Sequence, residues 1–284
     1  MSAILSSLLK DHPAGISDAI NTAKEICQEI ILSGLWRSNF FNHMAFHGGT
    51  ALRIFYDIDR FSEDLDFCQI DDGPVDLATI GGFIEDEFES LGLEFHVSSR
   101  IRKESNITGY KVKGNASDTM IAFGFQKEIL DALNPDAVIS IKIDVDVDTP
   151  KGFGIDHKFK TYPFNYGTTL LDKPSLFAAK TSAVITRHWK NRIKGRDLYD
   201  FEWYIRNGTP INTVYLINNL QREGIVSDND ITRDELVEIL RNRFDSIDYH
   251  SAIDDLYPFI DNKKIPQNWS SNHFNDMIEM MKFV

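Results

Sequence analysis

The segment GGTALRIFYDIDRFSEDLDF, residues 48–67, places three carboxylates within four positions, at Glu63, Asp64 and Asp66. Two like charges about 4 Å apart repel by about 1 kcal/mol in water and by about 4 kcal/mol at the effective dielectric of a protein surface. On a strand, alternate residues share a face, so Ser62, Asp64 and Asp66 would point one way and Glu63 the other. Mg²⁺ is held by one or two carboxylates together with substrate phosphates. A bound cation would therefore compensate the repulsion between Asp64 and Asp66, with Glu63 excluded as a ligand.

A second acidic strand is predicted at ISIKIDVDVD, residues 139–148, where Lys142, Asp144, Asp146 and Asp148 alternate with Ile and Val. If this strand neighbours the first in one sheet, a third carboxylate completes a two-metal site for phosphoryl transfer. The alternative for both segments is the solvated face of an amphipathic strand. The alternation leaves open whether Asp146 and Asp148 take part.

A glycine turn precedes the first acidic segment. Gly48, Gly49 and Thr50 open a short predicted helix, and backbone amides at such a helix start can hold a phosphate. The order of glycine turn, short helix, acidic strand and second acidic strand is similar to that of nucleotidyltransferases of the polymerase-beta superfamily. That resemblance implies a site for a nucleoside triphosphate (NTP) and its metals.

The elements that must position these residues predict an α+β protein. Helix-like and strand-like patterns alternate through the first part of the chain, with strands expected at residues 61–70, 119–126 and 137–147 among others. After residue 168 the pattern becomes helical, beginning near Pro174 with Asp172 or Ser175 as cap. We therefore expect a domain with a mixed sheet at 1–168 and a helical domain at 169–284.

Composition limits the possible partners. The formal net charge of −13 argues against a protein that coats nucleic acid non-specifically, because phosphate binding needs clustered Lys and Arg. The segment RHWKNRIKGR, residues 187–196, is a local exception, although such a charge run is usually a solvated helix face. Two cysteines suggest buried free thiols, and no apolar run approaches the roughly 20 residues of a membrane span, so a cytoplasmic protein without membrane contact is expected.

Two separated motifs carry a more specific resemblance. The segment 48–67, together with SLFAAKTSAVITRHWKNRIKGRDLYDFEWYI at 175–205, resembles the AbiEii/AbiGii-type nucleotidyltransferase toxins of type IV toxin–antitoxin and phage-abortive-infection systems. The first is similar to their G-G/S…D-x-D motif, and the second to their A-x-K followed by R-x-K-G-R-D-x-x-D. The segment 141–156 is similar to their strand with a carboxylate two residues after a Lys.

The resemblance implies a role for each matched residue. It makes Gly48, Gly49 and Thr50 the triphosphate cradle, with Ser62 beside them, and it makes the metal ligands Asp64, Asp66 and Asp144. Asp144 would also orient or help deprotonate the incoming hydroxyl. The helical domain would contribute Lys180, which would stabilise the triphosphate charge, and Asp197, which would be an essential acidic residue. Arg192 and Arg196 would contact phosphate or RNA. By sequence alone Lys180 could instead be a surface lysine, and Asp197 could cap the helix that follows Gly195.

The resemblance implies Mg²⁺- or Mn²⁺-dependent transfer of a nucleotide from an NTP to RNA, with the 3′ end of tRNA as the expected acceptor, which would block translation. A cognate antitoxin, a winged-helix repressor encoded nearby, is the expected partner. Two alternatives stay open: a nucleotidyltransferase acting on a small-molecule or protein hydroxyl, and a non-catalytic binding protein with this fold.

Overall fold

The computed structural model describes residues 16–73, 76–101, 107–187, 193–227 and 231–284. The chain divides into two units, each treated separately below. Unit 1 comprises Met1–Thr50, Glu63–Thr149 and Asp156–Leu170, and unit 2 comprises Ala51–Ser62, Pro150–Ile155 and Leu171–Val284. Two short segments from before residue 168, the predicted boundary, thus belong to unit 2.

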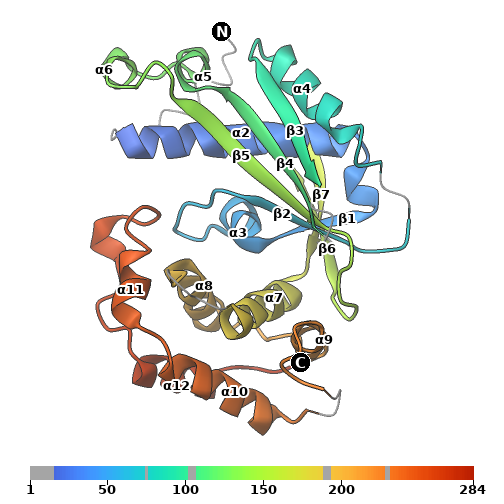
Figure 1. Ribbon diagram of the computed structural model, residues 1–284, viewed down its shortest axis with the longest axis vertical. Helices are drawn as coiled ribbons and strands as arrows, with labels where there is room; N and C mark the ends of the chain where they lie inside the picture. Colours follow the sequence, from blue (N-terminus) through green and yellow to red (C-terminus); the bar gives the residue numbers. More distant parts are fainter. Residues whose placement is uncertain (1–15, 74–75, 102–106, 188–192, 228–230) are drawn as a thin grey trace. The chain divides into compact units, whose positions relative to one another are not determined.

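Unit 1 is built on a seven-stranded mixed sheet with the order β3-β4-β5-β2-β1-β7-β6 (Figure 1). Strands β2 and β5 pair in parallel, as do β1 and β7, whereas β1–β2, β3–β4 and β4–β5 are antiparallel. The α+β class with a mixed sheet is therefore confirmed. The strands are β1 (Met44–His47), β2 (Leu65–Gln69), β3 (Phe95–Ile101), β4 (Ile107–Asn115), β5 (Val138–Asp146), β6 (Ile155–Lys160) and β7 (Tyr166–Leu171).

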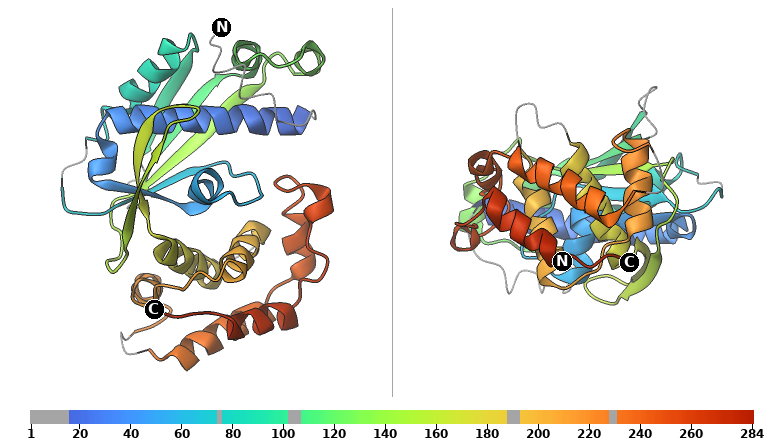
Figure 2. Two further views of the ribbon diagram at one scale, coloured as in Figure 1. Left: turned by 180° about the vertical axis from the view of Figure 1, so that it is seen from behind. Right: turned by 90° about the horizontal axis from the view of Figure 1, so that it is seen from below.

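One face of this sheet is covered by helices. Figures 1 and 2 show α2 (Ile16–Arg37) lying across the strands, and α4 (Ile80–Ser90) packs against both α2 and β3. Residues of α2 at helical spacing are buried, among them Ala23, Cys27 and Ile30. Because β-strand residues alternate between faces, Ile141, Ile143 and Val145 of β5 are fully buried, whereas polar residues occupy the opposite face. Cys27 and Cys68 are both buried free thiols, as expected.

Two predicted strands differ from the structure. The strand expected at 119–126 is wrong, because α5 (Ala116–Phe123) occupies this segment. The Asn115 side chain accepts a hydrogen bond from the Asp118 amide, a favourable N-cap, and Gly124 ends the helix with a φ of 86°. The strand expected at 61–70 is shorter, since β2 begins only at Leu65. The remaining short helices of unit 1 are η1 (Phe40–Asn42) and α6 (Lys127–Asp131).

Unit 2 is mainly helical, as predicted for the C-terminal region. Asp172 caps α7 by accepting from the Ser175 amide, and Pro174 lies in its first turn. Around α7 and α8 an aromatic core forms, in which Phe201 contacts Phe177, Phe244 and Phe274. The described helices of unit 2 are α3 (Gly48–Tyr56, from Ala51 onward), α7 (Lys173–Thr186), α8 (Gly195–Arg206), α9 (Thr213–Arg222), α10 (Arg233–Asp245), α11 (Tyr249–Asp254), η2 (Asn262–Lys264) and α12 (Ser271–Glu279).

Candidate functional site

The two acidic segments are neighbours in the sheet of unit 1. Strands β2 and β5 pair in parallel with Asp66 opposite Asp144, between the buried pairs Leu65–Ile143 and Phe67–Val145. Because buried residues take the helix-covered face, both carboxylates occupy the other face. The two acidic strands are therefore neighbours in one sheet, which is the condition for Asp144 to act as a third carboxylate.

Asp64 and Ser62 precede this strand. Because β2 begins only at Leu65, strand alternation does not fix the directions of Ser62 and Asp64, and the shared face expected for them with Asp66 stays a prediction. Ser62 is buried and belongs to unit 2. Glu63, excluded as a ligand, forms an ion pair of 3.7 Å with Lys24 of α2.

The glycine turn lies directly against Asp66. Gly48 has a φ of +78°, and a Cβ added there would come within 2.4 Å of Asp66 Oδ2. A carboxylate at the N-terminal end of a helix is favoured by the positive end of the helix dipole, which here is the start of α3. The fold thus offsets part of the acidic repulsion before any ligand binds.

Thr50 connects this turn to the acidic segment. Its fully buried hydroxyl donates a short hydrogen bond to the backbone carbonyl oxygen of Asp64. Thr50 therefore holds Asp64 beside the start of α3, a positioning role that the sequence did not suggest.

Lys142 acts as an internal counterion for the carboxylates. It comes two residues before Asp144 on the same strand face, and its ammonium donates to Asp144 Oδ2. Although partial burial opposes it, the hydrogen bond and the charge of Asp144, with Asp64 and Asp66, raise the pKa of Lys142. Burial and the charge of Asp66 raise the pKa of Asp64, against the opposing effect of Lys142.

This donor set fits a divalent cation that arrives with its substrate. Among the described residues, no group of three or more His, Cys, Asp or Glu side chains is arranged to enclose a metal ion. Mg²⁺ commonly takes only one or two carboxylates and completes its shell with water and substrate phosphates. Asp66 and Asp144 lie in register and supply two carboxylates. The charges of both also raise the pKa of Asp64, which therefore lies near them.

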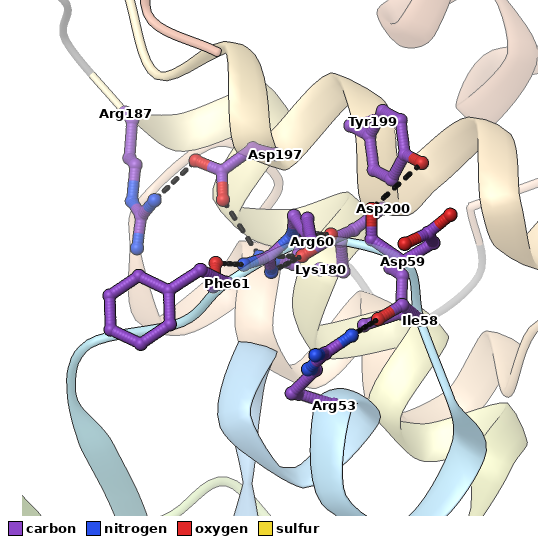
Figure 3. Close-up of polar contacts among 10 residues, drawn as sticks. All are labelled: Arg53, Ile58, Asp59, Arg60, Phe61, Lys180, Arg187, Asp197, Tyr199 and Asp200. Carbon is purple, nitrogen blue, oxygen red and sulfur yellow. Dashed lines mark hydrogen bonds and ion pairs between the residues drawn. The ribbon is translucent and has the colours of Figure 1, made fainter. Parts of the chain in front are cut away.

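A second charged cluster lies wholly in unit 2 (Figure 3). Lys180 of α7 contacts Asp197 Oδ1 at 2.8 Å and Asp200 Oδ2 at 2.9 Å, both in the first turns of α8. Arg187 donates to the other oxygen of Asp197. Lys180 is therefore a directed, largely buried amine rather than a solvated surface lysine, and Asp197 lies inside the first turn of α8 rather than at its cap.

Asp200 is held by a second cation. Arg60 forms a bidentate pair with it, Nε to Oδ1 and Nη2 to Oδ2 both at 2.6 Å, with both side chains almost fully buried. Burial raises the pKa of Asp197 and Asp200, but the charges of Lys180, Arg187 and Arg60 outweigh this and lower both values. These carboxylates are consequently ionised anchors for the surrounding cations.

Of the two arginines expected to contact phosphate or RNA, one can be described. The Arg196 guanidinium lies 3.7 Å from the centroid of the Phe259 ring, a cation–π contact. Arg192 lies outside the described residues.

The ion pairs that Lys142, Arg60 and Arg187 form with these carboxylates were not predicted from the sequence. The signal for Lys142 was available, because strand alternation already placed it on the face of Asp144. No signal existed for Arg60, whose partner Asp200 is 140 positions away.

Comparison with known proteins identifies the family. The family model described as "Nucleotidyl transferase AbiEii toxin, Type IV TA system" matches residues 30–276. The chain belongs to the AbiEii family. It is therefore a nucleotidyltransferase toxin of the toxin–antitoxin type, and the family implies an NTP substrate and an antitoxin partner.

Solved structures share this fold. MenT4, a nucleotidyltransferase toxin from Mycobacterium tuberculosis H37Rv, superposes with a TM-score of 0.57 at 16% identity, covering 98% of this chain and 88% of MenT4. JHP933 from Helicobacter pylori gives a TM-score of 0.54 at 15% identity, covering 92% and 90% of the two chains. Among curated proteins none matches. No described helix of this AbiEii-family chain is long and apolar enough to cross a membrane.

Proposed function

We propose that this chain transfers a nucleoside monophosphate from an NTP to the 3′ end of a tRNA, in a reaction that needs Mg²⁺ or Mn²⁺. The observation that carries the proposal is the registered pair Asp66–Asp144 beside the Gly48 turn. Two carboxylates next to a helix start form a site for a metal-bound phosphate group.

The residues of unit 1 would divide the work at the α-phosphate. Asp66, Asp144 and Asp64 would hold the cation, which supplies charge neutralisation for the transferring phosphoryl group. Gly48, Gly49 and the Thr50 backbone would cradle the triphosphate, with Ser62 as a further contact. Asp144 would orient the attacking 3′-hydroxyl and help accept its proton. The hydroxyl oxygen bonds to the α-phosphorus as the bond to the β-phosphate breaks, and pyrophosphate leaves.

The residues of unit 2 would stabilise charge in the same reaction. Lys180 would neutralise the triphosphate, and Asp197 would keep Lys180 and Arg187 oriented. Arg196 and Arg192 would contact phosphate or RNA. Because phosphoryl transfer needs mainly positioning and charge stabilisation, such a set of cations is sufficient without a covalent nucleophile.

The biological consequence would follow from the acceptor. A tRNA extended at its 3′ end cannot be aminoacylated, so translation stops. We place this toxin in the cytoplasm, controlled by a winged-helix repressor antitoxin encoded nearby, in growth control or phage defence.

One observation favours a different acceptor. The net charge of −13 disfavours binding of a large polyanion, so a small-molecule or protein hydroxyl is the second candidate for the same chemistry.

Incubation with each α-labelled NTP, Mg²⁺ and either total tRNA or RNA-free cell extract separates the candidates. We expect label on tRNA from at least one NTP, and none after chelation of the metal. If protein or a small molecule carries the label and tRNA carries none, the second candidate is established. No label on any acceptor from any NTP would favour a binding protein that kept the fold.

A further inference from the structure

The charged cluster of unit 2 holds more cations than its acids balance. Arg60 is paired with Asp200, and Asp197 receives both Lys180 and Arg187. Lys194 adds a further positive charge within electrostatic range of Arg187, Arg196 and Lys180. In a chain with a net charge of −13, such a local positive excess points to an anionic ligand.

Lys194 is an exposed member of this cluster. It makes no ion pair or hydrogen bond with any residue in the described part of the chain. Partial burial of the ammonium, followed by the charges of Arg187 and Arg196, lowers the pKa of Lys194, with Asp197 opposing. Repulsion among these like charges costs free energy, which a bound anion would offset.

The backbone at Lys194 is fixed rather than free to swing away. A Cβ added at Gly195 would lie 1.8 Å from the carbonyl oxygen of Ala252, because the start of α8 passes directly over the backbone of α11. Only glycine permits this approach. The position of Lys194 beside the cluster is consequently built into the packing of α8 on α11.

We infer that Lys194 is a phosphate-binding residue, the accessible cation of a phosphate subsite in unit 2. The inference rests on the proposed function, in which two ligands carry phosphate: the triphosphate of the NTP and the backbone of the acceptor RNA. An ammonium donates charge-assisted hydrogen bonds to phosphate oxygens of either.

Binding measurements on the full chain separate the two sources without requiring catalysis. The probes are inorganic tripolyphosphate with Mg²⁺, and a labelled RNA hairpin with a single-stranded 3′ end and no triphosphate. The variant is Lys194→Gln, with Lys194→Arg as the charge-conserving form. Lys264→Gln is the matched control, because Lys264 is an exposed lysine of unit 2 that already pairs with Asp59.

We expect Lys194→Gln to weaken one of the two probes at least about ten-fold, Lys194→Arg to restore most of it, and Lys264→Gln to change neither. Loss for tripolyphosphate assigns the subsite to the NTP, and loss for the hairpin alone assigns it to the acceptor. Unchanged binding of both probes, or equal weakening in Lys264→Gln, would overturn the inference. A wild type that binds tripolyphosphate through Lys194 but transfers no nucleotide would refute the proposed function and leave this subsite standing.

Discussion

Asp66 of β2 and Asp144 of β5 lie directly opposite each other across a parallel strand pair, although 78 positions separate them. The Gly48 turn touches Asp66, and the Lys142 ammonium binds Asp144. Each carboxylate thus has its own source of positive potential, one from a helix start and one from a lysine. This arrangement explains how the sheet tolerates the acidic pair in the absence of a bound cation.

Gly48→Ala should lower both stability and activity. The residue has a φ of +78°, and the new methyl group would meet Asp66 Oδ2 at 2.4 Å. Strain of this kind costs on the order of 1–3 kcal/mol, and it would also displace the carboxylate. Urea unfolding measures the cost. Gly82→Ala is the control, because nothing lies within 4 Å of its Cβ position in α4. That control should gain about 0.5–1 kcal/mol of stability, and a Gly48→Ala protein as stable as wild type would contradict the described turn.

Lys142→Met should destabilise the metal-free protein at low ionic strength. Lys142 is half-exposed, so its charge contributes no more than about 1 kcal/mol. The loss should shrink in about 1 M salt, where the carboxylate repulsion is screened. Thermal unfolding at two salt concentrations measures the difference. Lys113→Met, an exposed lysine on the same sheet face without an ion pair among the described residues, should show no such dependence. A salt-independent loss in Lys142→Met would show that the lysine acts through packing.

Asp200→Leu should destabilise the protein by about 3–5 kcal/mol, because it leaves the buried Arg60 charge without its carboxylate. Arg60→Met should cost less, because Lys180 still pairs with Asp200. The double variant should lose less than the sum of the two. A double-mutant cycle from urea unfolding gives the coupling between them. Additive single effects would mean that the bidentate pair contributes no coupling to stability.

Stability should fall in acid through Asp197 and Asp200. Their pKa values are lowered in the folded protein, because Lys180, Arg187 and Arg60 outweigh the effect of burial. A group with a depressed folded pKa stabilises above its unfolded pKa of about 3.9, and that contribution is lost as pH falls further. The free energy of unfolding should therefore drop below about pH 4. Asp200→Asn should be less stable at neutral pH and show a shallower drop, and an unchanged slope would contradict the assignment.

Features that depend on residues close together in the sequence were predicted better than contacts between distant residues. The alternation of apolar and polar residues located β5 correctly, with Asp144 and Asp146 on its polar face, because that pattern is local. The same pattern predicted that β2 starts at Phe61, four residues too early. The Phe61 amide donates a hydrogen bond to the carbonyl oxygen of Phe259 and not to a neighbouring strand. The segment 119–126 was taken for a strand although Asn115 and Gly124 are favourable helix ends. The register of Asp66 with Asp144 and the Arg60–Asp200 pair needed the three-dimensional structure.

The rate of nucleotide transfer by Asp66→Asn shows whether the acidic pair of the sheet is catalytic. The substitution removes a metal-binding charge at nearly constant size, and Asp86→Asn, an exposed residue of α4 in the same unit, is the control. Both variants and the wild type are incubated with α-labelled NTP, Mg²⁺ and total tRNA. We expect labelled tRNA from the wild type and Asp86→Asn, and at least about a 100-fold lower rate from Asp66→Asn, corresponding to the several kcal/mol that a metal ion supplies. Equal labelling by Asp66→Asn and the wild type would contradict a catalytic role for this pair.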